Sequence, residues 1–234
     1  MKHNSKKLTV SSSQELDTFI KQLNKAPVPV STAEKGKILF ALDATASRQP
    51  TWDHASHLQN SMFIEAGKLG GLALQLCYFR GFNDFQHSDW LTDADQLLQI
   101  MSRVHCAAGH TQIGRVLHHA LTETRKRQIQ AVIYIGDSME ESVDHLCQMA
   151  GELGLLNTPV FVFQEGNELV TKRALKEIAR LSGGAYHSFN NQSAHLLKQL
   201  LAAVAVYAAG GKKALQHFSK GKDQAVVNLL EQLK

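Results

Sequence analysis

The chain has 234 residues, 44% of them hydrophobic and 20% charged, with a formal net charge of +4. This is enough apolar material for a sizeable core, and the weak, scattered positive charge does not favour a nucleic-acid partner. The longest apolar run, 200–209, is too short to insert in a membrane, and the first residues lack the apolar core of a signal peptide. Three widely spaced cysteines indicate reduced thiols, so we expect a cytoplasmic protein.

The first 35 residues are typical of an extension that precedes the main domain. Ser12 and Glu15 have the spacing of a capping box, and an amphipathic helical segment follows them. Pro27 and Pro29 then predict the end of this helix and a linker. We assign residues 1–35 to an N-terminal helical extension and linker, and residues 36–210 to the main domain.

From Lys37 onward, short apolar runs alternate with amphipathic stretches. The apolar runs predict buried strands at 38–42, 72–79, 131–135, 160–163 and 185–189. The amphipathic stretches predict helices at 53–68, 94–104, 111–127, 141–153, 169–181 and 194–209. The polar, alternating segment 82–90 suits an edge strand or a hairpin return. This order predicts an α/β fold: a doubly wound, mostly parallel six-stranded sheet with one antiparallel edge strand and helices on both faces.

Gly210 and Gly211 are expected to break the chain after the last helix of the main domain. Residues 211–234 then predict a C-terminal helical extension with an apolar face formed by Ala225, Val226, Leu229, Leu230 and Leu233. Such a face either folds back onto the domain or docks a partner helix.

Polar residues follow the predicted strands at the carboxyl end of the sheet, where function gathers in doubly wound folds. Directly after the first strand, D-x-T-x-S places Asp43, Thr45 and Ser47 in one tight loop. Asp137 follows a central strand, and Thr111 opens a helix in a G-x-T-x-I setting. Thr111 also has a purely structural interpretation as the N-cap of that helix.

These five residues offer two carboxylates and three hydroxyls, and such hard oxygen ligands suit Mg²⁺ or Mn²⁺ rather than zinc. Hydroxyl groups coordinate an ion without cancelling its charge. A bound ion therefore stays electropositive, and we expect it to attract a carboxylate from another molecule.

The combination of D-x-T-x-S, a distant Thr and an Asp after a buried strand resembles the metal-ion-dependent adhesion site of von Willebrand factor A (vWA) domains. The resemblance extends from about Lys37 to Ala209 and also covers stand-alone bacterial vWA proteins. It implies that the first and fourth strands lie side by side, so that Asp43 and Asp137 flank one crevice. It also implies that Thr45 and Ser47 are direct ligands, that Thr111 and Asp137 bind directly or through water, and that Asp43 anchors waters.

The sequence departs from the vWA pattern in two places. Thr45 stands where the first loop serine is usual, which keeps the oxygen and adds a methyl group. The last loop reads Gly-Asp-Ser where Thr-Asp-Gly is common, so the position of Asp137 is less securely predicted. The alternative is a degenerate site whose residues only cap helices.

The function implied is a protein-binding module in which the metal ion holds a Glu or Asp of a partner protein. Arg48, His110 and Glu140 neighbour the five ligands in sequence and are expected to form a rim that contacts the partner. A second hypothesis is a scaffold that binds through its terminal helices and not through a metal.

An enzyme of the GDS esterase type is a less favoured hypothesis. Ser138 follows Gly136 and Asp137 as such a nucleophile would, but the D-x-x-H segment 84–87 lies upstream, and none follows Ser138. A phosphatase would need D-x-D, and Thr45 occupies the second position. We therefore expect a binding protein and not an enzyme.

Overall fold

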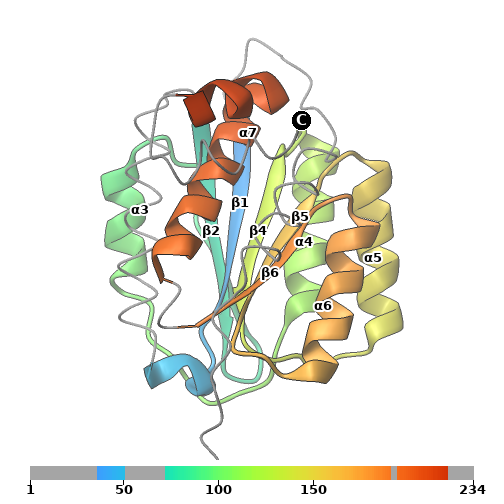
Figure 1. The fold of residues 1–234 in the computed structure, drawn as a ribbon. Helices are drawn as coiled ribbons and strands as arrows, with labels where there is room; N and C mark the ends of the chain where they lie inside the picture. Colours follow the sequence, from blue (N-terminus) through green and yellow to red (C-terminus); the bar gives the residue numbers. More distant parts are fainter. Residues whose placement is uncertain (1–35, 51–71, 191–193, 221–234) are drawn as a thin grey trace, which may run out of the picture.

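The computed structural model describes residues 36–50, 72–190 and 194–220. Six strands form one sheet in the order β3-β2-β1-β4-β5-β6 (Figure 1). All neighbours are parallel except β3, which runs antiparallel to β2 at the edge. This confirms the predicted fold class and the adjacency of the first and fourth strands. The strands are β1 (Gly36–Asp43), β2 (Leu72–Arg80), β3 (Asp84–His87), β4 (Ala131–Gly136), β5 (Val160–Glu165) and β6 (Tyr186–Phe189).

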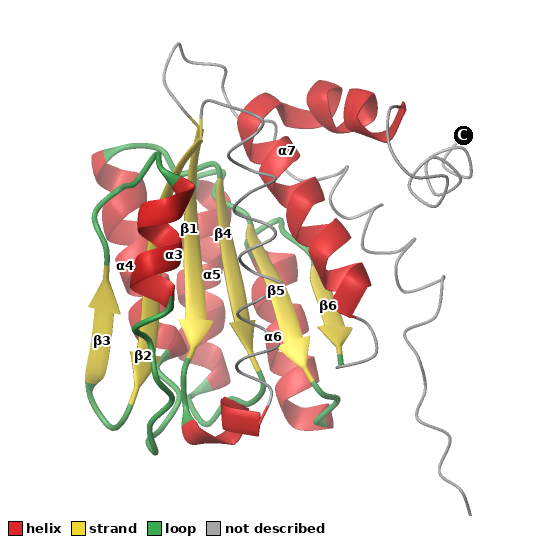
Figure 2. Cartoon of the chain, turned by 90° about the vertical axis from the view of Figure 1, so that its left-hand side faces the viewer, coloured by secondary structure: helices red, strands yellow, loops and turns green. Residues whose placement is uncertain are grey.

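Helices cover both faces of the sheet (Figure 2). One face carries α4 (Ile113–Lys126), α5 (Val143–Leu155) and α6 (Leu169–Leu181), which pack side by side. The other face carries α3 (Ala94–Met101) and α7 (Ala194–Lys220). No helix among the described residues is both long enough and apolar enough to cross a membrane.

The central strands are apolar on both sides because each face of the sheet has its own core. In β1, Ile38 and Phe40 belong to the core under α3 and α7, whereas Leu39 and Ala41 belong to the core under α4, α5 and α6. The same alternation runs through β4. Unbroken apolar runs are typical of parallel strands covered on both faces. In β1 the two charged residues, Lys37 and Asp43, therefore lie toward the ends of the strand.

The last helix differs from its prediction. The expected break at Gly210 and Gly211 is wrong, because α7 continues to Lys220. Figure 2 shows that α7 changes direction toward its end instead of stopping. The predictions for residues 1–35, for a helix at 53–68 and for the apolar face at 225–233 lie outside the described residues.

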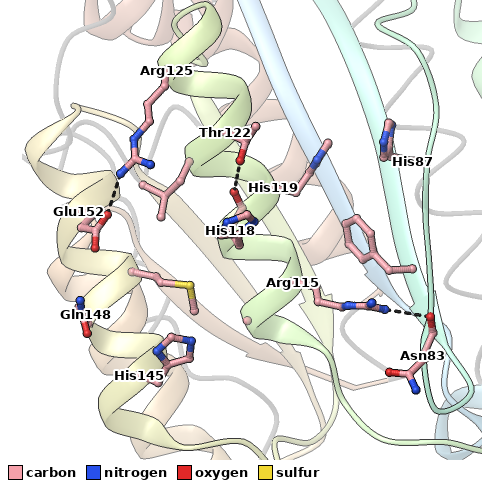
Figure 3. Close-up of a pocket in the computed structure, with 14 residues that line it drawn as sticks. Asn83, His87, Arg115, His118, His119, Thr122, Arg125, His145, Gln148 and Glu152 are labelled. Carbon is pink, nitrogen blue, oxygen red and sulfur yellow. Dashed lines mark hydrogen bonds and ion pairs between the residues drawn. The ribbon is translucent and has the colours of Figure 1, made fainter.

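Strand β2 and the edge strand β3 are held against α4 by the half-buried imidazole of His119. The Nε2 atom of His119 lies 2.9 Å from Oε1 of Gln75, and its ring stacks on that of His87 with the centroids 4.5 Å apart (Figure 3). Burial, together with the neighbouring His87, lowers the pKa of His119 to about 4. His119 therefore packs as a neutral ring at physiological pH.

We predict that His119 makes folding sensitive to mild acid. Its pKa is about 6.5 in an unfolded chain, so the unfolded state binds more protons than the folded state between pH 6.5 and 4. The stability contributed by neutral His119 is present above pH 6.5 and is lost as the pH falls toward 4. In urea unfolding across this range, His119→Gln should reduce the slope of unfolding free energy against pH by up to about 1.4 kcal/mol per pH unit.

His118→Gln is the matched control, because the neighbouring His118 side chain is exposed on the same helix. This control should keep the wild-type slope. An unchanged slope in His119→Gln would show that His119 is not the group that titrates.

Candidate metal centre

The D-x-T-x-S loop closes on itself directly after β1. The backbone N–H and the hydroxyl of Thr45 both donate to Oδ1 of Asp43, at 2.8 and 2.6 Å. The hydroxyl oxygens of Thr45 and Ser47 lie 3.1 Å apart. Ser47 belongs to the short 3-10 helix η1 (Ala46–Arg48), the blue helix at the lower edge of Figure 1. Three of the five predicted ligands are thus gathered in one turn.

The Asp43 carboxylate is buried, and only one of its two oxygens accepts hydrogen bonds from the described residues. Its side chain is inaccessible to solvent, and Oδ2 accepts no hydrogen bond from the described residues. Burial raises the pKa of Asp43 to about 6, and the charge of Asp137 adds to the rise, whereas the bonds from Thr45 and the charge of Arg48 oppose it. A buried carboxylate oxygen without a donor is costly. A bound cation would supply the missing partner.

Asp137 is placed by a close approach between β1 and β4. A side chain at Gly136 would collide with the Tyr134 hydroxyl and crowd Cβ of Asp43. Glycine at this position leaves room for the Tyr134 hydroxyl beside Asp43. Asp137 follows at once, partly exposed, with its Oδ1 3.3 Å from the Ser138 hydroxyl that donates to it. Leu42 pairs with Ile135 in parallel register, so Asp43 and Asp137 follow neighbouring strands at the same end of the sheet, and the charge of Asp137 contributes to the rise in the Asp43 pKa.

A third segment, 105–111, lies along the Asp43 loop. The N–H of Ala107 donates to the carbonyl of Ala44 at 3.0 Å, and Ala107 forms a bridge with Thr45. A side chain at Gly109 would collide with the backbone of Gly81, so the glycine before Thr111 is required. This close packing brings the Thr111 segment to the same end of the sheet as Asp43.

Thr111 is not the N-cap of α4. The N-cap is Gln112, which makes no side-chain cap bond. Instead, the Glu141 carboxylate accepts hydrogen bonds from the backbone N–H groups of Ile113 and Gly114, at 2.6 and 2.8 Å. The Thr111 Oγ1 accepts the N–H of Glu140 at 3.0 Å, which ties it to the loop that carries Asp137. Within the described segments, Thr111 forms hydrogen bonds with Glu140 and forms none with Thr45 or Ser47.

Glu141 is a structural residue that sequence reasoning missed. Its carboxylate lies at the positive end of the α4 dipole, where an anion is stabilised. A local signal could not reveal it, because Glu141 is 27 residues away from Gly114 in sequence. It fixes the start of α4 and so the position of Thr111.

The prediction that Arg48 belongs to an exposed rim is wrong. Its side chain has 0% exposure and lies beneath the Asp43 loop. Nη1 donates to the Asp43 carbonyl at 2.8 Å, and Nε pairs with the Glu165 carboxylate at 3.0 Å. Arg48 therefore fastens the loop to the end of β5. A long side chain beside a tight loop can be buried against that loop. Its position next to the ligands in sequence does not tell whether it is buried or exposed.

The other two rim candidates are exposed. Nδ1 of His110 lies 2.9 Å from Oε2 of Glu140, and their side chains are 68% and 52% exposed. An exposed pair of this kind contributes little to stability. The two residues are accessible at the edge of the candidate centre.

The residues present fit a hard divalent cation. In the part of the chain that the structure describes, no three side chains of His, Cys, Asp and Glu come together as a metal site. A zinc site of the usual kind is therefore not formed there. The fit rests on mixed ligands: the orphaned Oδ2 of Asp43, the hydroxyls of Thr45 and Ser47, and the nearby Asp137. Such an oxygen set suits Mg²⁺ or Mn²⁺.

An open hollow of about 820 Å³ lies over α4, between β3 and α5 (Figure 3). Four histidines line it: His87, His118, His119 and His145. The His87 and His119 rings are stacked within 24° of parallel, so their in-plane lone pairs cannot point at a common ion. The hollow is separate from the Asp43 loop, and we assign no metal to it.

Solved structures with the same fold include named vWA domains. The VWA domain of SpRpn10 aligns with a TM-score of 0.58 at 14% identity, covering 71% of this chain and 94% of that one. A von Willebrand factor type A protein from Catenulispora acidiphila aligns with a TM-score of 0.58 at 17% identity, covering 75% and 44%. An aerotolerance-related membrane protein from Bacteroides fragilis aligns with a TM-score of 0.55 at 15% identity, covering 71% and 98%.

No family model and no curated protein sequence matches this chain. The likeness to the solved structures is one of fold, because the identities are all below 20%. The chain therefore has the fold of vWA domains.

Proposed function

We propose that this protein is a protein-binding module that depends on a divalent metal ion. Asp43, Thr45, Ser47, Thr111 and Asp137 would hold Mg²⁺ or Mn²⁺, and the ion would bind a Glu or Asp side chain of a partner protein. The observation that supports this most directly is the buried Oδ2 of Asp43, which has no hydrogen-bond donor among the described residues and belongs to a loop with two clustered hydroxyls.

The ligand chemistry supports capture of a carboxylate. Thr45, Ser47 and Thr111 contribute neutral hydroxyls, so a bound ion keeps more of its charge than in an all-carboxylate site. Mg²⁺ prefers six oxygens and retains water readily. A partner carboxylate that replaces one water gains a charge-assisted contact in a partly desolvated crevice. One such contact is too small to hold two proteins, so a surrounding surface is needed.

The contacts of Ser138 favour a binding module over the esterase hypothesis. Its hydroxyl donates to Asp137, and no histidine forms a hydrogen bond with it within residues 36–50, 72–190 and 194–220. A serine nucleophile needs a base within hydrogen-bond reach. The scaffold hypothesis remains the second candidate, because α7 extends beyond the sheet to Lys220.

We predict that calorimetry with Mg²⁺ and with Mn²⁺ will show binding to one site. Asp43→Ala should abolish the binding heat, and Ser47→Ala should weaken binding at least tenfold, since each removes an oxygen from the proposed shell. Ser142→Ala is the matched control, because it removes an exposed hydroxyl of the same loop that is not a proposed ligand. Wild-type affinity in Asp43→Ala would refute the metal centre.

We predict that Asp43→Asn will stabilise the metal-free protein while removing its response to metal. The rise in the Asp43 pKa from 3.8 to about 6 corresponds to about 3 kcal/mol against the charged form. Asn removes the charge, but its amide is buried too, so we expect a net gain of about 1–3 kcal/mol. Thermal melting in EDTA at pH 7.5 should show the gain, and added Mg²⁺ should raise the melting temperature of wild type only.

We predict that partner capture requires the metal. The full chain should retain a partner from native lysate in Mg²⁺, and lose it with EDTA or with Ser47→Ala. Equal capture under all three conditions would show that the interaction bypasses the metal. That outcome would favour the terminal helices as the binding surface.

A further inference from the structure

A buried tyrosine hydroxyl lies beside the Asp43 loop. Tyr134 is 2% exposed, and its ring packs in the core under α4, α5 and α6, stacked on Phe79 with the centroids 6.4 Å apart. Its hydroxyl forms no hydrogen bond with the described residues. A buried hydroxyl without a partner costs free energy, so it points to a group that the described residues do not supply.

The close approach at Gly136 fixes the position of this hydroxyl. A Cβ atom at Gly136 would fall 2.3 Å from the Tyr134 hydroxyl oxygen and 3.2 Å from Cβ of Asp43. The hydroxyl and Asp43 therefore lie against the same backbone position, at the carboxyl end of β4. Threonine is common at this position in the vWA pattern, and here the tyrosine hydroxyl occupies the space that such a side chain would need.

Two neighbouring buried groups thus lack a hydrogen-bond partner, one of them a donor and the other an acceptor. Oδ2 of Asp43 accepts no hydrogen bond from the described residues, and the Tyr134 hydroxyl forms none with them. Burial raises the pKa of Tyr134, and the charges of Asp43 and Glu141 raise it further, so the hydroxyl keeps its proton and can donate. A buried water molecule is held by at least two polar groups, and these two groups can hold one.

A second buried tyrosine provides a comparison. The Tyr207 hydroxyl also has no hydrogen-bond partner among the described residues, but Tyr207 belongs to the core on the opposite face of the sheet. Burial raises the pKa of Tyr207, whereas the charges of Asp43, Glu141 and Asp137 act on the pKa of Tyr134 in addition to burial. Tyr134 is therefore close to the candidate centre, and Tyr207 is remote from it.

We propose that Tyr134 is a positioning residue of the candidate metal centre, and that its hydroxyl donates a hydrogen bond to a water molecule held between the bound cation and Oδ2 of Asp43. This inference rests on the proposed function. Mg²⁺ retains several of its waters in proteins, and hydrogen bonds to the ligands of an ion orient those ligands. The bond from Tyr134 holds the water and the Asp43 carboxylate in place and adds no charge to the site.

The test is calorimetric titration of the full chain with Mg²⁺, in which wild type is compared with Tyr134→Phe and Tyr207→Phe. Each substitution removes one buried hydroxyl and keeps the ring. Tyr134→Phe should weaken Mg²⁺ binding about tenfold or more, which is the usual effect of removing a group that orients a metal ligand. Tyr207→Phe is the matched control and should bind Mg²⁺ as wild type does.

Two further measurements separate a role at the metal from a structural role. Mg²⁺ should produce a tyrosine difference absorption spectrum in wild type and in Tyr207→Phe but not in Tyr134→Phe, because only the Tyr134 hydroxyl gains a hydrogen bond. In EDTA, Tyr134→Phe should melt at or above the wild-type temperature, because the hydroxyl that it removes has no partner within the described residues. A lower melting temperature would show that the hydroxyl has a structural role, and would overturn the proposal.

The outcomes distinguish this inference from the proposed function. If wild type binds Mg²⁺ and Tyr134→Phe binds it equally well, or if Tyr207→Phe loses as much affinity, the role of Tyr134 is overturned and the metal centre stands. A spectral change that is absent from wild type, or that persists in Tyr134→Phe, has the same meaning. If wild type binds neither Mg²⁺ nor Mn²⁺, the metal centre and this inference both fail.

Discussion

The buried carboxylate of Asp43 is the constraint on which the candidate centre depends. It lies where the apolar part of β1 ends. One of its oxygens accepts two hydrogen bonds from Thr45, and the other accepts none from the residues that the structure describes. Burial raises its pKa, so the folded chain holds a charge that its surroundings do not fully stabilise. Sites of this kind reduce stability in exchange for affinity, which is typical of binding centres.

The surroundings of Asp43 hold the loop in place without neutralising the carboxylate. Arg48 donates to the Asp43 carbonyl and pairs with Glu165, which fastens the loop to the end of β5. Gly136 leaves room for the Tyr134 hydroxyl beside Asp43. Glu141 accepts the N–H groups at the start of α4, and the Glu140 N–H donates to the Thr111 hydroxyl. These contacts hold the proposed ligands in place.

The vWA-like fold determines where such a site can lie but not what it binds. A parallel sheet gathers the carboxyl ends of its strands at one edge, where loops from β1, β4 and the segment before α4 meet. The three solved structures named above share this fold at 14–17% identity, so fold likeness alone carries no function. The function proposed here comes from the chemistry of five side chains.

The sequence by itself determined the order of elements, because unbroken apolar runs and helical periodicity are local properties. It predicted the antiparallel edge strand, and it brought Asp43, Thr45 and Ser47 together, since a single turn joins them. Only the tertiary structure decided that Arg48 is buried against the loop, that Glu141 caps α4 and that Oδ2 of Asp43 has no donor within the described part of the chain. These outcomes depend on contacts between residues far apart in the chain, such as Arg48 with Glu165, and no local pattern specifies which long side chains the packed core will bury.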